Sequence, residues 1–165
     1  MITESLTSPV HRVISQHKIA EVWLNASTNQ QSLHSLVEFN PGDEIADFGA
    51  GTIQSQPSYL TVQTGANRHI TLQPEFLQYI NHSCSPNVFF DTHSMKLICL
   101  RPILIGEEMR FFYPSTEWDM AQPFVCNCGS SECQQLINGA SHLSLETLSK
   151  YCLSKFINEQ LTQKV

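Results

Sequence analysis

Basic side chains are scarce in this chain. Its 165 residues contain 9 Lys plus Arg against 15 Asp plus Glu, which gives a formal net charge of -6. No basic stretch could neutralise a row of phosphates, so a nucleic acid is not the expected direct ligand. An acidic surface instead favours a basic partner, such as a peptide rich in lysine or arginine.

Long apolar runs are missing as well. No segment approaches the roughly 18 consecutive apolar residues of a membrane span, and the amino end, MITESLTSPVHRV, lacks the apolar core of a signal peptide. We therefore expect no membrane association and residence where the chain is made, in the cytoplasm or, in a eukaryote, the nucleus. In such a reducing compartment the six cysteines are expected to be metal ligands or buried thiols.

Glycine is absent from the first 41 residues, so Gly42 is the first position that can adopt a positive φ at low cost. The run Asn40-Pro41-Gly42-Asp43 predicts a turn around it. The composition is otherwise typical of one compact domain, with 41% hydrophobic and 15% charged residues.

Short segments rich in β-branched and aromatic residues predict a β-rich α+β fold. A short internal helix is predicted over 74–80, where Pro74 suits the first helical position. The tail predicts one terminal helix with Ser144 as N-cap, Leu143 stapled onto Leu148, and a packing stripe. That stripe contains Leu145, Leu148, Cys152 and Phe156. The predicted strands are 20–24, 36–45, 58–65, 68–72, 88–91, 95–103 and 108–113, with a hairpin joining 88–91 to 95–103.

The segment CNCGSSEC places three cysteines, Cys126, Cys128 and Cys133, within eight residues. This density is typical of a metal centre, yet a tetrahedral zinc needs four ligands. The alternative is three buried or free thiols near a loop.

Three motifs follow one another in order: NHSCSPN at 81–87, GEEMRFFY at 106–113 and CNCGSSEC at 126–133. Together they resemble the SET-domain protein lysine methyltransferases, whose pattern runs N-H-S-C-x-P-N, G-E-E-L-x-x-x-Y and a post-SET C-x-C-x4-C. The stretch leading into the cysteines is also similar to small bacterial members. The resemblance covers roughly residues 33 to 138.

The resemblance implies a SET-domain β-clip with a pseudoknot, a short internal helix, a post-SET zinc segment and a C-terminal helix. On this basis residues 1–32 would hold N-terminal strands and a divergent cofactor loop, and 33–115 the SET-like core. Residues 116–138 would form the post-SET zinc-binding segment, and 139–165 the C-terminal helix.

The resemblance also implies that Cys84 is the fourth ligand of a structural zinc, beside Cys126, Cys128 and Cys133. Four thiolates are a common structural zinc set. If Cys84 is not a ligand, the fourth could be Cys99, Cys152, His82 or His142.

Methyl transfer from S-adenosyl-L-methionine to a lysine ε-amine of a basic protein or peptide is the implied activity. Tyr113 matches the catalytic tyrosine; its alternative is a half-buried tyrosine at a strand end. Phe111, on the same strand face, matches a substrate-channel position and favours di- or trimethylation. Asn87 is expected to hold the pseudoknot crossing.

The implied cofactor-binding residues are Asn81, His82, Tyr59 and Phe124. Tyr59 could equally be the inward aromatic of a strand over 58–61. Trp118 is placed in the substrate channel, and both it and Phe124 could instead pack around the zinc. The oligomeric state stays open.

One departure weakens the implied activity. Relatives carry a G-x-G turn whose glycines let the backbone approach the cofactor, but the corresponding residues here are Gln30, Gln31 and Ser32. Gln78 also replaces an Arg common before N-H-S-C. Either another loop shape, such as one over 25–29, makes those contacts, or the chain is a catalytically weak or inactive, zinc-stapled module that binds a peptide or protein.

Overall fold

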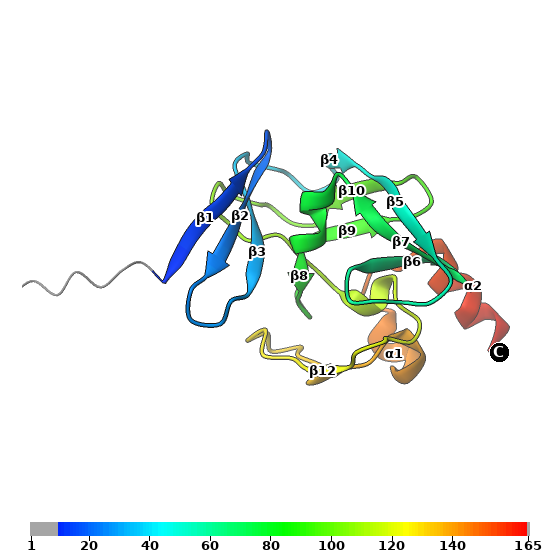
Figure 1. Cartoon of the computed structure of the whole chain (residues 1–165). Helices are drawn as coiled ribbons and strands as arrows, with labels where there is room; N and C mark the ends of the chain where they lie inside the picture. Colours follow the sequence, from blue (N-terminus) through cyan, green and yellow to red (C-terminus); the bar gives the residue numbers. More distant parts are fainter. Residues whose placement is uncertain (1–9, 165) are drawn as a thin grey trace, which may run out of the picture.

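The computed structural model describes residues 10–164, and strands dominate it (Figure 1). Residues 1–9, part of the expected N-terminal segment, and residue 165 lie outside the described residues. The β-rich α+β class is confirmed, with helices that are all short. Within residues 10–164 no helix has both the length and the apolar character needed to cross a membrane.

An antiparallel sheet lies at one end of the molecule, with strand order β1 (His11–Gln16), β2 (Ala20–Asn25) and β3 (Gln31–Ser35) (Figure 1). The sequence predicted only β2 among these strands. In β1 no residue is buried, so its side chains lack the alternation that marks a half-buried strand. An isolated bridge between His34 and Glu108 connects this sheet to the rest of the chain.

Two further antiparallel sheets complete the body of the molecule. One has the order β4 (Glu44–Asp47), β10 (Lys96–Cys99) and β9 (Val88–Asp91), which confirms the predicted hairpin. The other has the order β5 (Gly49–Gln54), β7 (Arg68–Gln73) and β6 (Thr61–Gly65). The strand predicted over 36–45 is wrong for residues 36–43: β4 begins only at Glu44, after a turn in which Gly42 has a φ of 92°.

Two hydrophobic clusters hold these elements. The larger joins the sheets around fully buried side chains that include Leu33, Ile70, Phe90 and Leu97. The smaller joins the tail to the middle of the chain through Phe112, Ile137, Leu148, Phe156 and Ile157, together with Cys84 and Cys126. The second cluster thus places the tail beside the NHSC motif.

The helices correct one prediction and refine another. The internal helix is a 3-10 helix, η1 (Glu75–Tyr79), and further 3-10 turns are η2 (Tyr113–Ser115) and η3 (Ala140–His142). The predicted terminal helix is wrong as one element, because it divides into α1 (Leu145–Leu148) and α2 (Lys155–Gln163). The Ser144 hydroxyl caps α1 as predicted, but Ser154 caps a new helix, and Leu145 and Cys152 are exposed.

The middle of the chain contains the expected crossing. Strand β8 (Asn81–His82) runs parallel to β11 (Arg110–Phe111), which brings two distant motifs together. The buried Asn87 side chain holds the crossing: its Nδ2 donates to Glu108 O at 2.8 Å and its Oδ1 accepts from Arg110 N at 2.8 Å. The strand predicted over 108–113 is therefore shorter than expected and ends at Phe111.

Asn87→Ala should lower the free energy of unfolding by about 2 to 3 kcal/mol, because it leaves two backbone groups of the crossing without partners. Urea denaturation measures the change. Asn158→Ala, at an exposed position in α2 that donates one hydrogen bond to Leu153 O, is the control and should lose less than about 1 kcal/mol. Equal losses in the two variants would contradict the role given to Asn87.

Candidate functional site

A cavity of about 660 Å³ opens where the crossing meets the tail, a size within the range of small-molecule sites. Its walls come from the β2–β3 turn, the β5–β6 loop, β8, β11 and the segment that leads to the cysteines. Among the lining residues are Tyr59, Asn81, His82, Phe111, Tyr113 and Phe124. The structure therefore gathers six of the seven residues that the sequence proposed for catalysis, cofactor binding or the substrate channel.

The β2–β3 turn lies directly before Gln30, Gln31 and Ser32, the positions that correspond to the G-x-G turn, and Gln31 and Ser32 themselves belong to β3. Asn25 Oδ1 accepts hydrogen bonds from Ser27 N at 2.9 Å and Thr28 N at 3.2 Å, and Asn29 adopts a φ of 60°. Asparagine tolerates this left-handed conformation better than most residues. Asn25 and Gln30 line the cavity, so a turn built by asparagines contributes to its wall without glycine.

Asn81 connects this turn to the crossing. Its Nδ2 donates to Gln31 O at 2.8 Å and to Glu108 Oε1 at 3.3 Å. The side chain thus joins β8 to the start of β3, at one of the positions where glycine is missing.

His82 contacts both the catalytic candidate and the cysteines. Its buried ring accepts a hydrogen bond from Tyr113 N at Nδ1, 3.1 Å away, which leaves the proton on Nε2. Nε2 lies 3.3 Å from Cys84 Sγ. Burial, helped by the positive charge of Arg110, lowers the pKa of His82 to about 4, so the ring is neutral at pH 7.

Tyr113 lies among aromatic rings at the first residue of η2. Its ring centroid is 4.7 Å from that of Phe111, 5.1 Å from that of His82 and 5.9 Å from that of Phe124. Burial, together with the negative charges of Glu117 and Glu108, raises the pKa of Tyr113 to about 12. The phenol therefore keeps its proton at neutral pH.

Tyr59 and Trp118 occupy different surroundings. Tyr59 is 75% exposed and precedes β6, so the alternative of an inward strand aromatic is wrong, although the residue does line the cavity. Trp118 is not among the lining residues and packs in the smaller hydrophobic cluster, with Lys164 Nζ 4.7 Å from its ring centroid. This placement favours packing over the proposed channel role for Trp118.

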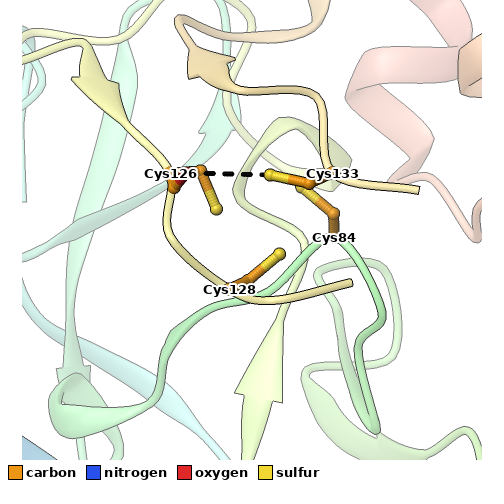
Figure 2. A group of neighbouring side chains, drawn as sticks. All are labelled: Cys84, Cys126, Cys128 and Cys133. Carbon is orange, nitrogen blue, oxygen red and sulfur yellow. Dashed lines mark hydrogen bonds between the residues drawn. The ribbon is translucent and has the colours of Figure 1, made fainter. Parts of the chain in front are cut away.

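Four cysteine side chains meet beside the cavity. Figure 2 shows Cys84, Cys126, Cys128 and Cys133 directed toward a common centre, and their sulfur atoms all lie within 4.8 Å of one another. Cys84 and Cys126 are buried, and Gln134 N donates to Cys84 Sγ at 3.3 Å. This group, the cysteine cluster, could hold a metal ion.

The other candidate ligands lie outside the cysteine cluster. Cys99 Sγ donates to Arg101 O at 2.9 Å, Cys152 is exposed, and His142 Nε2 lies 2.8 Å from Asp119 Oδ1. His82 contacts Cys84 but is absent from the group that converges.

The thiols of the cysteine cluster differ in acidity. Burial raises the pKa of Cys84. For Cys128 burial acts in the same direction, but hydrogen bonds from the backbone at Cys84 and Ser130 outweigh it and lower the pKa to about 6. One thiolate is thus favoured at neutral pH, which suits a cation at the centre.

Comparison with known proteins decides the family. A model described as "SET domain" matches residues 17–114. The chain belongs to the SET domain family. It is 37% identical over 158 residues to the protein named "Methyltransferase flvH" of Aspergillus flavus, an alignment that covers 94% of this chain and 88% of that relative.

Two larger relatives match shorter segments of this chain. It is 32% identical over 74 residues to "Histone-lysine N-methyltransferase 2B" of Homo sapiens, covering 41% of this chain. It is 29% identical over 95 residues to "Histone-lysine N-methyltransferase, H3 lysine-36 specific" of Schizosaccharomyces pombe, covering 54% of this chain. The alignments span only 3% and 12% of those relatives.

The cavity of this SET chain contains an acidic residue that the sequence did not reveal. Glu117 lines the cavity and is 8% exposed, and its Oε2 accepts from Gln63 N at 3.0 Å and Thr116 Oγ1 at 2.7 Å. Burial, only partly opposed by these hydrogen bonds, raises its pKa to about 7. A single Glu in an irregular segment carries no periodic signal, so only the fold identifies it.

The pKa of Glu117 predicts a pH dependence of stability. The group is raised from its ordinary 4.5 to about 7, so the unfolded chain ionises first and the wild type loses stability as pH rises from about 4.5 to 7. Over this pH range the free energy of unfolding of the wild type should fall by about 3 kcal/mol relative to that of Glu117→Gln. Urea denaturation across this pH range measures it, with Glu159→Gln on the exposed face of α2 as control. Parallel curves for wild type and Glu117→Gln would contradict the shift.

Proposed function

We propose that this chain is an S-adenosyl-L-methionine-dependent protein lysine N-methyltransferase with a structural zinc. The observation that carries the proposal is that Asn81, His82 and Tyr113 line one cavity together with Phe124 of the tail. Membership of the SET family and the methyltransferase names of the relatives support the same reaction class. The net charge of -6 supports a basic, lysine-containing protein or peptide as substrate.

S-adenosyl-L-methionine would supply the methyl group from its sulfonium sulfur to the lysine nitrogen, with the neutral thioether as the leaving group. The lysine must be neutral to react, and with a pKa of ~10.4 its deprotonation at pH 7 costs about 4 to 5 kcal/mol. The rings of Phe111, Tyr113 and Phe124 would lower this pKa by excluding water from the amine. Positioning then carries much of the catalysis.

The residues of the cavity divide into two roles in this proposal. The β2–β3 turn, Asn81 and the rings of His82 and Phe124 would hold the cofactor, with polar groups for its amino-acid part and aromatic faces for its adenine. Tyr113 would accept a hydrogen bond from the neutral amine and orient its lone pair. Phe111 has no hydroxyl, which would leave room for a second or third methyl group.

The cysteine cluster fits a structural zinc. In a tetrahedron with Zn–S bonds of about 2.3 Å the sulfur atoms are about 3.8 Å apart, close to the observed gathering within 4.8 Å. Four thiolates leave no open coordination position, so the metal would hold the tail to Cys84 and take no part in the chemistry.

The second candidate function is a catalytically weak or inactive SET module that binds a peptide or protein. The absence of glycine at Gln30, Gln31 and Ser32 favours it, while the asparagine turn at the cavity favours the enzyme. Binding of the cofactor separates the two functions.

Calorimetric titration should detect S-adenosyl-L-methionine binding to the wild type, and absence of binding at millimolar concentration would leave only the binding module.

Transfer of a labelled methyl group to a pool of basic proteins should fall about 10- to 100-fold in Tyr113→Phe, since the phenol of Tyr113 would contact the reacting atoms. Tyr79→Phe, which is outside the lining residues, is the matched control and should keep its rate. Full activity in Tyr113→Phe would overturn the assignment of Tyr113.

Elemental analysis should find one zinc ion per chain. Cys84→Ser should lower this content strongly, because three thiolates bind zinc more weakly than four, while Cys152→Ser, at an exposed position, should keep it. Circular dichroism would confirm that both variants fold. An unchanged one-to-one content in Cys84→Ser would remove Cys84 from the site.

A further inference from the structure

Glu117 is held rigidly in the wall of the cavity. It follows η2, and its backbone N donates to Tyr113 O at 3.0 Å. Two hydrogen bonds join its segment to β6: Gln63 N donates to Glu117 Oε2, and Trp118 N donates to Gln63 Oε1, both at 3.0 Å. Strand β6 pairs with β7 on its other side, so Glu117 is fixed to the free edge of a sheet.

The two carboxylate oxygens of Glu117 have different surroundings. Oε2 accepts both side-chain hydrogen bonds, from Gln63 N and Thr116 Oγ1. Among the described residues, Oε1 accepts no hydrogen bond and Glu117 forms no ion pair, yet Oε1 is not sealed from solvent. Since the residue lines the cavity, Oε1 is the oxygen available to a ligand there.

A buried carboxylate with an oxygen that accepts no hydrogen bond is suited to bind a cation. The buried charge is destabilising alone, and an ammonium group that donates a hydrogen bond to it would satisfy both partners. The neighbouring ring of Tyr113 and the Phe111 side chain would surround the aliphatic stem of the same ligand. A primary alkylammonium ion, apolar along its stem and charged at its tip, matches these walls.

We propose that Glu117 binds the ammonium group of the incoming substrate through Oε1 and so selects a protonated amine for this cavity. This inference rests on the proposed function for the identity of the amine as lysine. Glu117 acts at the binding step, where its negative charge favours the protonated amine, and the lowering of the amine pKa by the apolar rings follows only after the amine has left Oε1. Glu117 thereby discriminates lysine from neutral side chains of the same length. The other ionisable residues that line the cavity are Tyr59, His82, Glu108, Arg110, Tyr113, Cys126 and Cys128. His69 on β7 lies opposite Gln63 on β6.

The test uses n-butylammonium chloride as the probe and n-butanol as its neutral counterpart, at pH 8, with nuclear magnetic resonance of the backbone amides. Butylammonium should bind the wild type about tenfold more tightly than butanol and shift the Gln63 and Trp118 amide signals. Glu117→Gln, which keeps a side-chain oxygen that accepts from Gln63 N, should remove this preference. Glu117→Asp should retain part of it, because the charge remains.

Two controls keep the inference falsifiable. Thr116→Val removes a hydrogen bond to Oε2 but keeps the charge, so it should keep the preference for butylammonium, as should Glu159→Gln. Equal binding of the two probes by the wild type, or an unchanged preference in Glu117→Gln, would overturn the role of Glu117.

Activity separates this inference from the proposed function. If methyl transfer occurs, Glu117→Gln should raise the KM for the basic protein pool about tenfold with a smaller change in kcat, and an unchanged KM would overturn the role of Glu117 alone. If the wild type prefers butylammonium but binds no S-adenosyl-L-methionine, the proposed enzyme fails and the amine-binding role stands.

Discussion

The cysteine cluster is the constraint on which the cavity depends. The segment after η2 has little regular structure: its strands β12 (Phe124–Val125) and β13 (Leu136–Ile137) have two residues each, and Val125 and Leu136 are exposed. Burial of so few side chains gives little stability to this hairpin. Cys126, Cys128 and Cys133 of this segment gather around Cys84, and the ring of Phe124 lies against that of His82, at a centroid distance of 5.6 Å.

His82 connects the cysteine cluster to Tyr113. One ring nitrogen lies against Cys84 Sγ and the other accepts from Tyr113 N. A displacement of the cysteine cluster would therefore move the His82 ring and, through it, change the position of Tyr113. Within the cavity Tyr113 stays protonated and His82 neutral near pH 7, whereas the raised pKa of Glu117 lets this carboxyl group titrate there.

Sequence motifs predicted the parts that depend on specific side chains. The order of NHSCSPN, GEEMRFFY and CNCGSSEC was enough to anticipate the crossing held by Asn87 and the gathering of four cysteines. The missed parts lack such signals. Strand β5 has five exposed residues of six, the tail helix breaks at a second serine cap, and the positive φ of Asn29 in the β2–β3 turn is adopted by a residue other than glycine. Glu117 was missed because its environment arises from β6, far away in the sequence.

We propose that the cysteine cluster, with zinc bound, holds one wall of a cofactor site. The most direct measurement is the affinity for S-adenosyl-L-methionine of one preparation before chelation of zinc, after chelation and after zinc is restored. Our account predicts that affinity is lost with the metal and returns with it, because Phe124 is released from His82. Unchanged affinity in the zinc-free protein would contradict it.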